Sequence, residues 1–387
     1  MVELLNNWKN GRWIGQTPEV ENGVCAVPQS PEAADLPYTD EVKKATDHLY
    51  DEVSDFIPKF EWPAYAVLVH AINTLKKQKN AVILAHNYMT PDIYALVGDY
   101  KGDSLGLAIE ATKTSAEIIV QAGVHFMAET SKILCPDKKV LIPSMRAGCS
   151  LASSITGDDM RLIKQKYPGI PVVTYVNATA DVKAETDICC TSSNAVQVVE
   201  HIAKQRGVNK VIMAPDEFLA KNVANMTGVE VIAWHGRCEV HARFSAEDVR
   251  EMRERWPNVK VLAHPECPPD VVAESDFTGS TKAMSDYVSD NKPKNVVLLT
   301  ECSMSDNVAM ANPDVDFVRP CNLCPHMKRI TLQNIYDCLR FEQYEVKVPK
   351  RIAKKAKLAV QRMIDLPAPG NKSHFDPKAV HKDIKVI

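Results

Sequence analysis

A strand followed by a triplet that begins with a polar residue occurs three times in this chain at a constant interval. This repeat restricts the fold more than any other feature. The triplets are His86-Asn87-Tyr88, Tyr175-Val176-Asn177 and His264-Pro265-Glu266. The step from 86 to 175 and the step from 175 to 264 both equal 89 residues. Equal steps of this kind indicate three copies of one structural unit.

The agreement continues downstream of each triplet. An aspartate precedes a hydroxyl-bearing residue by five positions in every copy, in the pairs Asp99 and Ser104, Asp187 and Ser192, and Asp276 and Thr281. A second apolar strand follows, predicted at Ile118–Gln121, Val211–Ala214 and Val296–Thr300. Each copy then reaches its own cysteine, with steps of 89 and 86 residues between Cys149, Cys238 and Cys324.

Strands that alternate with helices at this spacing form parallel sheets. We therefore predict an α/β fold of three similar three-layer domains, with parallel sheets arranged about a pseudo-threefold axis. The predicted parts are an N-terminal extension over residues 1–60, repeats over 61–150, 151–240 and 241–335, and a C-terminal helical tail over 336–387. Because the carboxyl ends of parallel strands form a binding edge, the triplets and the three cysteines should face the axis.

The composition favours a small-molecule partner. With 46 basic and 49 acidic residues, the chain lacks the basic excess that binds nucleic acid or an anionic membrane. No apolar stretch approaches the ~20 residues that cross a bilayer, and the N-terminus has no secretory signal. We expect a cytoplasmic protein whose 11 cysteines are reduced thiols or metal ligands rather than disulfides.

The segment from Trp234 to His241 admits two interpretations. Cys238 stands three residues before His241, as in half of a zinc site, but it is also one of the three cysteines of the repeat. Three converging thiolates leave a zinc ion one ligand short, whereas they suit a 4Fe-4S cluster with one open iron. The alternatives are ordinary buried thiols, or a metal site in which Cys321 and Cys324 act together.

Polar side chains near the strand ends are candidates for binding and proton transfer. Hydroxyl groups at helix N-termini suit the oxygens of an anion, although N-capping is their simpler role. The hydroxyl groups in question belong to Ser104, Ser192 and Thr281. Imidazole, carboxyl and phenol groups can exchange protons where they are partly desolvated. Those near the strand ends are His86, His241, His264, Glu266 and Tyr175.

Longer segments around these residues follow one another in a fixed order. They include Gly102-Asp103-Ser104-Leu105, Phe126-Met127-Ala128-Glu129-Thr130, Ala147-Gly148-Cys149-Ser150-Leu151, Thr191-Ser192-Ser193-Asn194, Gly236-Arg237-Cys238-Glu239-Val240-His241, Gly279-Ser280-Thr281, Thr300-Glu301 and Cys324-Pro325-His326-Met327-Lys328. Together with the three triplets, this ordered set resembles the quinolinate synthase family, the iron-sulfur enzymes of NAD biosynthesis.

The resemblance implies condensation of iminoaspartate with dihydroxyacetone phosphate to quinolinate, with release of phosphate and two waters. It implies a 4Fe-4S cluster with one open iron, a Lewis acid, held by Cys149, Cys238 and Cys324. It assigns acid–base chemistry to Glu266, Tyr175, His264 and His241. It assigns substrate binding to His86, Tyr88, Ser104, Asn177, Ser192 and Thr281. It also implies a functional link to the enzyme that oxidises L-aspartate to iminoaspartate.

Two other functions stay open on the sequence. Another cluster-dependent hydro-lyase would use the open iron without a condensation, and an assay of quinolinate formation distinguishes it. A non-enzymatic metal-binding sensor would use Cys321 and Cys324, and serine at either position should then be equally damaging. The synthase interpretation requires Cys324 alone of these two.

Overall fold

The computed structural model describes residues 8–9, 12–13, 36–320, 322–367 and 374–387. Near the N-terminus, β1 (Trp8–Lys9) pairs with β2 (Arg12–Trp13) in an antiparallel hairpin. The continuous description begins shortly before α1 (Asp40–Thr46) and the 3₁₀ helix η4 (Asp47–Glu52). In the described part of the chain, no helix combines the length and the apolar character needed to cross a membrane.

The fold is α/β, as predicted, and the described residues form three parallel sheets that share one strand order. The first sheet contains β3 (Ala81–His86), β4 (Tyr100–Gly102), β5 (Ile118–Ala122) and β6 (Lys139–Leu141). The second sheet contains β7 (Val172–Tyr175), β8 (Ile188–Cys190), β9 (Lys210–Ala214) and β10 (Glu230–Ala233). The third sheet contains β11 (Lys260–Ala263), β12 (Phe277–Gly279), β13 (Asn295–Leu299) and β14 (Asp316–Val318).

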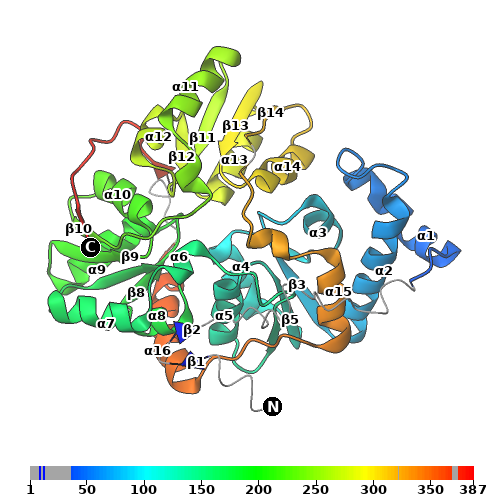
Figure 1. Ribbon diagram of the computed structural model, residues 1–387, viewed down its shortest axis with the longest axis horizontal. Helices are drawn as coiled ribbons and strands as arrows, with labels where there is room; N and C mark the ends of the chain where they lie inside the picture. Colours follow the sequence, from blue (N-terminus) through cyan, green and yellow to red (C-terminus); the bar gives the residue numbers. More distant parts are fainter. Residues whose placement is uncertain (1–7, 10–11, 14–35, 321, 368–373) are drawn as a thin grey trace, which may run out of the picture.

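Each sheet runs in the order second, first, third, fourth strand: β4-β3-β5-β6, β8-β7-β9-β10 and β12-β11-β13-β14. The sheets appear in Figure 1 in cyan, green and yellow. The two strands predicted for every repeat are confirmed: the first correspond to β3, β7 and β11, and the next to β5, β9 and β13. The short strands β4, β8 and β12 were not predicted, because three residues carry too little pattern to distinguish a strand from a loop.

The three repeated aspartates have one structural role. Their carboxylates accept the backbone N–H of Ile83, Val172 and Val261 at 2.8, 2.9 and 2.9 Å. Their own N–H groups donate to the carbonyl oxygens of the same three residues. Each aspartate therefore joins the start of its second strand to the first strand, which fixes the register of the pair. The predicted pseudo-threefold axis stays a prediction.

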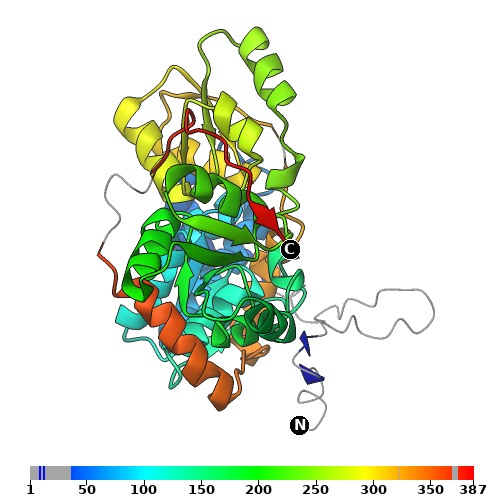
Figure 2. The ribbon, with the colours of Figure 1, turned by 90° about the vertical axis from the view of Figure 1, so that its left-hand side faces the viewer.

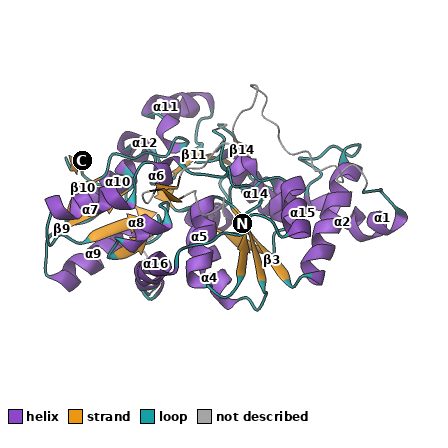
Figure 3. Cartoon of the chain, turned by 60° about the horizontal axis from the view of Figure 1, so that its bottom comes forward, coloured by secondary structure: helices purple, strands orange, loops and turns teal. Residues whose placement is uncertain are grey.

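Helices cover both faces of these sheets. In Figure 3, α4 and α5 lie on one side of the first sheet, and α2 and α15 lie on the other. The helices of the first sheet are α2 (Trp62–Gln78), α3 (Pro91–Leu96), α4 (Ser104–Lys113) and α5 (His125–Leu134). Those of the second are α8 (Ala180–Ala184), α9 (Ala195–Arg206) and α10 (Glu217–Met226). Those of the third are α12 (Pro269–Glu274), α13 (Thr281–Asn291) and α14 (Cys302–Ala311).

A capped helix follows each repeated cysteine. The N-cap residue stands seven positions after the cysteine in all three copies, and each N-cap forms a capping box with the residue three positions further on. The N-caps are Thr156, Ser245 and Thr331, and the helices are α7 (Gly157–Lys166), α11 (Ala246–Arg255) and α15 (Leu332–Phe341). Between cysteine and N-cap lie the short turns α6 (Ser150–Ser153), η5 (His241–Arg243) and η6 (Met327–Arg329).

The C-terminal part of the chain contacts all three sheets. Helix α15 packs on α2 of the first sheet, and α16 (Lys350–Ile364) packs on α8 and β8 of the second. Strand β15 (His374–Phe375) then pairs antiparallel with β12, and β16 (Lys385–Val386) pairs parallel with β10. Figure 2 shows this red segment passing from the third sheet to the edge of the second. The tail thus holds two strands in addition to its helices.

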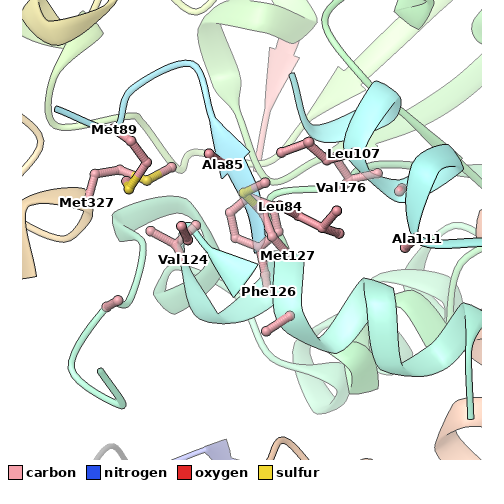
Figure 4. Packing of buried hydrophobic residues seen from close by; sticks show 14 of the residues in the cluster. Leu84, Ala85, Met89, Leu107, Ala111, Val124, Phe126, Met127, Val176 and Met327 are labelled. Atoms are coloured by element: carbon pink, nitrogen blue, oxygen red, sulfur yellow. The ribbon is translucent and has the colours of Figure 1, made fainter. Parts of the chain in front are cut away.

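The largest apolar cluster joins the first and second sheets. Apolar residues of β3 are buried along most of the strand, as expected for a parallel sheet with helices on both faces. Figure 4 shows Val176, from the loop after β7, beside Leu107 and near Leu84 of β3 and Met127 of α5. This packing brings the carboxyl ends of β3 and β7, and hence two of the triplets, to one place.

Candidate active site

One cavity collects side chains from all three sheets. It lies where the first strands end, the position expected for ligand binding in a parallel sheet. Every site residue predicted from the sequence lines it: His86, Tyr88, Ser104, Cys149, Tyr175, Asn177, Ser192, Cys238, His241, His264, Glu266, Thr281 and Cys324. Residues up to 238 positions apart in the chain thus share one chamber.

The three repeated cysteines face this cavity as partly buried thiols. Burial raises the pKa of the Cys149 thiol to about 12, and a negative charge on Cys324 adds to the effect. Burial also raises the pKa of Cys238, followed by the charges of Glu266 and Cys149. Because each thiolate disfavours the next, all three ionise together only next to a strongly positive group. A metal cluster is such a group, so this donor set fits one.

Glu266 is the best-connected carboxylate in the cavity. The Tyr175 hydroxyl donates to its Oε1 at 2.5 Å, and Nδ1 of His241 lies 3.1 Å from its Oε2. Burial acts to raise the pKa of Glu266, but the adjacent His241, His264 and Tyr175 together outweigh burial and hold this pKa well below its usual range. Burial and the charge of Glu266 raise the pKa of Tyr175 well above normal. At neutral pH a carboxylate therefore faces a protonated phenol.

His241 contacts both metal-ligand and carboxylate candidates. Its Nδ1 lies 3.2 Å from Sγ of Cys238, and its ring stacks on His264 with 4.6 Å between ring centroids. One donor atom each from Cys238, His241 and Glu266 lie within 4.8 Å of one another. The sequence resemblance assigns Cys238 to a metal cluster and His241 to acid–base chemistry. The structure places the two side chains in contact rather than apart.

His86 and His264 occupy equivalent turns. Nδ1 of His86 accepts the N–H of Tyr88 at 3.1 Å, and Nδ1 of His264 accepts the N–H of Glu266 at 3.3 Å. Burial lowers the pKa of His86 to about 4 and that of His264 to about 3, so both rings are neutral at pH 7. With Nδ1 an acceptor, the single proton of each ring sits on Nε2. Each ring thus offers one N–H donor.

The predicted hydroxyl groups are not the caps of their helices. Ser104 and Thr281 are the first residues of α4 and α13, whereas the capping side chains are Asp103 and Ser280. Ser192 lies in the turn before α9. The simple capping interpretation is therefore wrong for Ser104 and Thr281. Both hydroxyl groups lie at helix N-termini, where the macrodipole favours negative charge.

Among the described residues that line the cavity there is no lysine or arginine. Its acidic members are Asp103, Glu239 and Glu266. An anionic ligand would therefore depend on hydroxyl, amide and imidazole N–H donors, on helix N-termini and on any metal group that the thiols hold.

Residues just after β13 of the third sheet also belong to the surroundings of the cavity. Thr300 follows β13, and Glu301 is the N-cap of α14. The Lys328 ammonium lies 2.9 Å from Oε1 of Glu301 and donates to the carbonyl oxygen of Tyr88 at 2.9 Å. No role was assigned to these three residues from the sequence. From the sequence, polar residues at strand ends were considered only for β3, β7 and β11. The same search at the ends of β5, β9 and β13 would have found Thr300.

Comparisons with known proteins agree with this geometry. A sequence model of the family described as quinolinate synthetase A protein matches residues 70–365. The chain is 61% identical over 352 residues to a quinolinate synthase of Caulobacter vibrioides, covering 90% of this chain and 96% of that protein. It is 62% identical over 316 residues to quinolinate synthase 2 of Mesorhizobium japonicum, covering 82% of this chain and 96% of that one.

A third relative, quinolinate synthase of Sinorhizobium medicae, is 58% identical over 335 residues, covering 87% of this chain and 92% of that protein. In each of the three comparisons the aligned part includes more than nine tenths of the relative. The chain is therefore a biosynthetic enzyme that belongs to the quinolinate synthetase A protein family.

Proposed function

We propose that this enzyme condenses iminoaspartate with dihydroxyacetone phosphate to form quinolinate, with release of phosphate and two waters. The observation that carries the proposal is the single cavity, where three thiols, a linked carboxylate and a set of neutral hydrogen-bond donors meet. The printed names of the relatives, each a quinolinate synthase, agree with it. The reaction needs no net oxidation or reduction, so no redox cofactor is required.

We assign Cys149, Cys238 and Cys324 as the ligands of a 4Fe-4S cluster that has one open iron. Such a cluster supplies Lewis-acid chemistry when bound. Support comes from the donor set, because thiols whose pKa values rise through burial and through each other's charge need a positive group in order to ionise. We also expect a reducing compartment, the cytosol, since the same thiols must stay free of disulfides.

The residues proposed for binding are all neutral donors or acceptors. They are His86, Tyr88, Ser104, Asn177, Ser192 and Thr281. A substrate with several carboxylates or a phosphate suits them, because two of the hydroxyl groups stand at the N-termini of α4 and α13. Neutral donors bind an anion without forming an ion pair that would resist product release.

The residues proposed for proton transfer form one connected group. Glu266 is ionised and within hydrogen-bond distance of Tyr175 and His241, so it can accept a proton from carbon and return it to a leaving hydroxyl group. The Tyr175 phenol is protonated at neutral pH, which suits it to donate. The His264 ring lies beside the same carboxylate, with Nδ1 3.7 Å from Oε1 of Glu266, and the N–H of its Nε2 is available to donate to a substrate. An enzyme that oxidises L-aspartate would supply the iminoaspartate.

The test is direct. Protein purified without oxygen and loaded with iron and sulfide should show broad visible absorbance and convert the two precursors to quinolinate, measured by chromatography. Loaded protein that forms no quinolinate would contradict the proposal. Turnover of a hydroxy acid without condensation would instead indicate another cluster-dependent hydro-lyase.

A second candidate rests on the proximity of Cys238, His241 and Glu266, whose donor atoms could hold a single metal ion. This arrangement would suit an enzyme that uses one zinc ion in place of a cluster. Metal analysis separates the two candidates. Iron and sulfide in equal amounts, about four of each per chain, indicate the cluster, whereas one zinc ion without sulfide indicates the alternative.

A further inference from the structure

Thr300 is a fully buried residue at the junction between the first and third sheets. It follows β13 directly and precedes the N-cap of α14. The described residues that line the cavity do not include it, so it has no direct access to a bound ligand. A polar side chain at such a depth requires hydrogen-bond partners inside the protein.

Its partners are two of the residues proposed for the active site. Oγ1 of Thr300 lies 2.6 Å from the Tyr88 hydroxyl and 2.9 Å from Nε2 of His241. Tyr88 comes from the loop after β3, in the first sheet, and lies 212 positions away in the chain. His241 comes from η5, between the second and third sheets. One hydroxyl group therefore joins side chains from distant parts of the fold.

Chemistry limits the roles of the groups along this path. A carboxylate oxygen only accepts, so Nδ1 of His241 carries the proton shared with Glu266. The Thr300 hydroxyl is both a donor and an acceptor, so it can bond Nε2 of His241 and the Tyr88 hydroxyl at the same time. These two contacts constrain the positions of the Tyr88 hydroxyl and the His241 ring.

We propose that Thr300 is a positioning residue of the active site, whose hydroxyl holds the Tyr88 phenol and sets the ring orientation of His241. This inference rests on the proposed function, because it assigns Tyr88 and His241 to quinolinate formation. The role is specific to the hydroxyl group, since the methyl group of threonine cannot make either contact.

The matched variants are Thr300→Val and Thr300→Ser. Valine keeps the shape and removes the hydroxyl, leaving two buried polar atoms without a partner. Serine keeps the hydroxyl and removes only a methyl group. We expect Thr300→Val to lower kcat by about 10- to 100-fold through His241, the range seen when a group that orients a functional side chain is lost, and to raise KM through Tyr88. Thr300→Ser should stay close to the parent enzyme in both parameters.

Iron content and crystal structures supply readouts that do not depend on activity. All three proteins should bind the same amount of iron. In crystals, the Tyr88 hydroxyl and the His241 ring should leave their positions in Thr300→Val and keep them in Thr300→Ser. If Thr300→Val does not fold, Thr300→Ala removes the same hydroxyl with less bulk and takes its place in each comparison.

Three results would overturn the inference: a normal kcat in Thr300→Val, an equal loss in both variants, or unchanged side-chain positions in the Thr300→Val crystal. A parent enzyme that binds iron yet forms no quinolinate would instead contradict the proposed function. The crystallographic comparison still tests the positioning role in that case, so the two failures are distinguishable.

Discussion

At the scale of single residues, the site depends on Glu266 more than on any other acid. It accepts hydrogen bonds from groups of the second sheet and of η5, and its own backbone N–H sets the tautomer of His264. A carboxylate with two donors on it is held in one orientation and is ionised in the resting site. This is the arrangement expected of a general base that must act repeatedly without moving.

We predict that Glu266→Gln abolishes turnover and keeps the cluster. The amide places an NH₂ group against the Tyr175 hydroxyl or against the N–H of His241, and it cannot accept a proton. Loss of a general base typically costs on the order of 100-fold or more in kcat. Initial rates and iron content of the variant are the measurements. Glu274→Gln, which alters an exposed partner of Arg250, is the matched control and should be neutral. Loss of iron from Glu266→Gln would mean that the residue is structural.

The cysteine ligands give a second residue-scale prediction. Cys324→Ser should bind far less iron than the parent protein, because serine is a poor ligand for an iron-sulfur cluster. Cys135→Ser is the control, since Cys135 is buried and directs its thiol at the carbonyl oxygen of Ala111, away from the cavity. Iron and sulfide per chain are measured after anaerobic reconstitution. Equal iron in the two variants would contradict the assignment.

Cys321 completes that comparison. It lies outside the described residues, so its part in the argument rests on the sequence alone. The cluster proposal predicts that Cys321→Ser keeps its iron, whereas a sensor built on Cys321 and Cys324 predicts equal loss in both variants.

At the same scale, sequence reasoning found the residues that occupy repeated positions and missed Thr300, which does not. His86 and His264 were predicted because they share a position in equivalent turns, and their Nδ1 atoms indeed accept equivalent backbone N–H groups. Thr300 has proline or glycine at the corresponding positions after β9 and β5, Pro215 and Gly123, so no repeat marks it. Its importance depends on contacts across 212 positions, which periodicity does not reveal.

At the scale of elements, the capped helix after each repeated cysteine explains why the segments that carry the three cysteines enter their helices in the same way. The capping box fixes the direction in which the chain enters the helix, and the cysteine stands seven residues earlier in every copy. The sequence predicted the cysteines, strands and hydroxyl groups of the repeat, but the packing of α15 on the first sheet depends on tertiary contacts with α2 that no local pattern specifies. The division at 61–150, 151–240 and 241–335 stays a prediction.

The end of α15 carries a pH-dependent attachment. Glu342 lies 2.7 Å from Lys79 at the end of α2 and 2.5 Å from Lys139 of β6, and the hydrogen bonds from Lys139 and then Lys79 lower the pKa of Glu342 to about 2 from its ordinary 4.5. We predict that Glu342→Gln lowers the free energy of unfolding at pH 7 by about 0.5–1 kcal/mol, the usual value for partly exposed pairs.

The sign of the pH effect follows from the lowered pKa. The stabilisation is complete above pH 4.5 and is lost as pH falls toward 2, because the native carboxylate is then protonated as well. Urea unfolding of both proteins between pH 7 and pH 3 measures it, and the difference between them should shrink in acid. Glu110→Gln, which breaks a pair within α4, is the control and should have a smaller effect. A difference that is constant with pH would contradict the attachment.

At the scale of the whole molecule, the C-terminal segment connects sheets that the cavity needs together. Phe375 is buried and pairs with Thr278 in β12, while the next residue donates its N–H to the sulfur of Met226 at the end of α10. The segment then reaches β10, where Ile387 donates to Ala233. It therefore joins the second and third sheets close to Thr281, the first residue of α13, which lies two residues after the end of β12.

We predict that Phe375→Ala loosens the third sheet against the second. Removing a buried phenylalanine side chain costs about 3–5 kcal/mol, and the loss should fall first on the pairing of β15 with β12. Backbone amides of residues 277–279 should then exchange hydrogen faster, as mass spectrometry of peptides can measure. Val380→Ala, at a side chain that is 78% exposed, is the control and should leave exchange unchanged. Faster exchange in the first sheet instead would mean that Phe375 supports the whole core rather than this junction, because the same apolar cluster extends to β3.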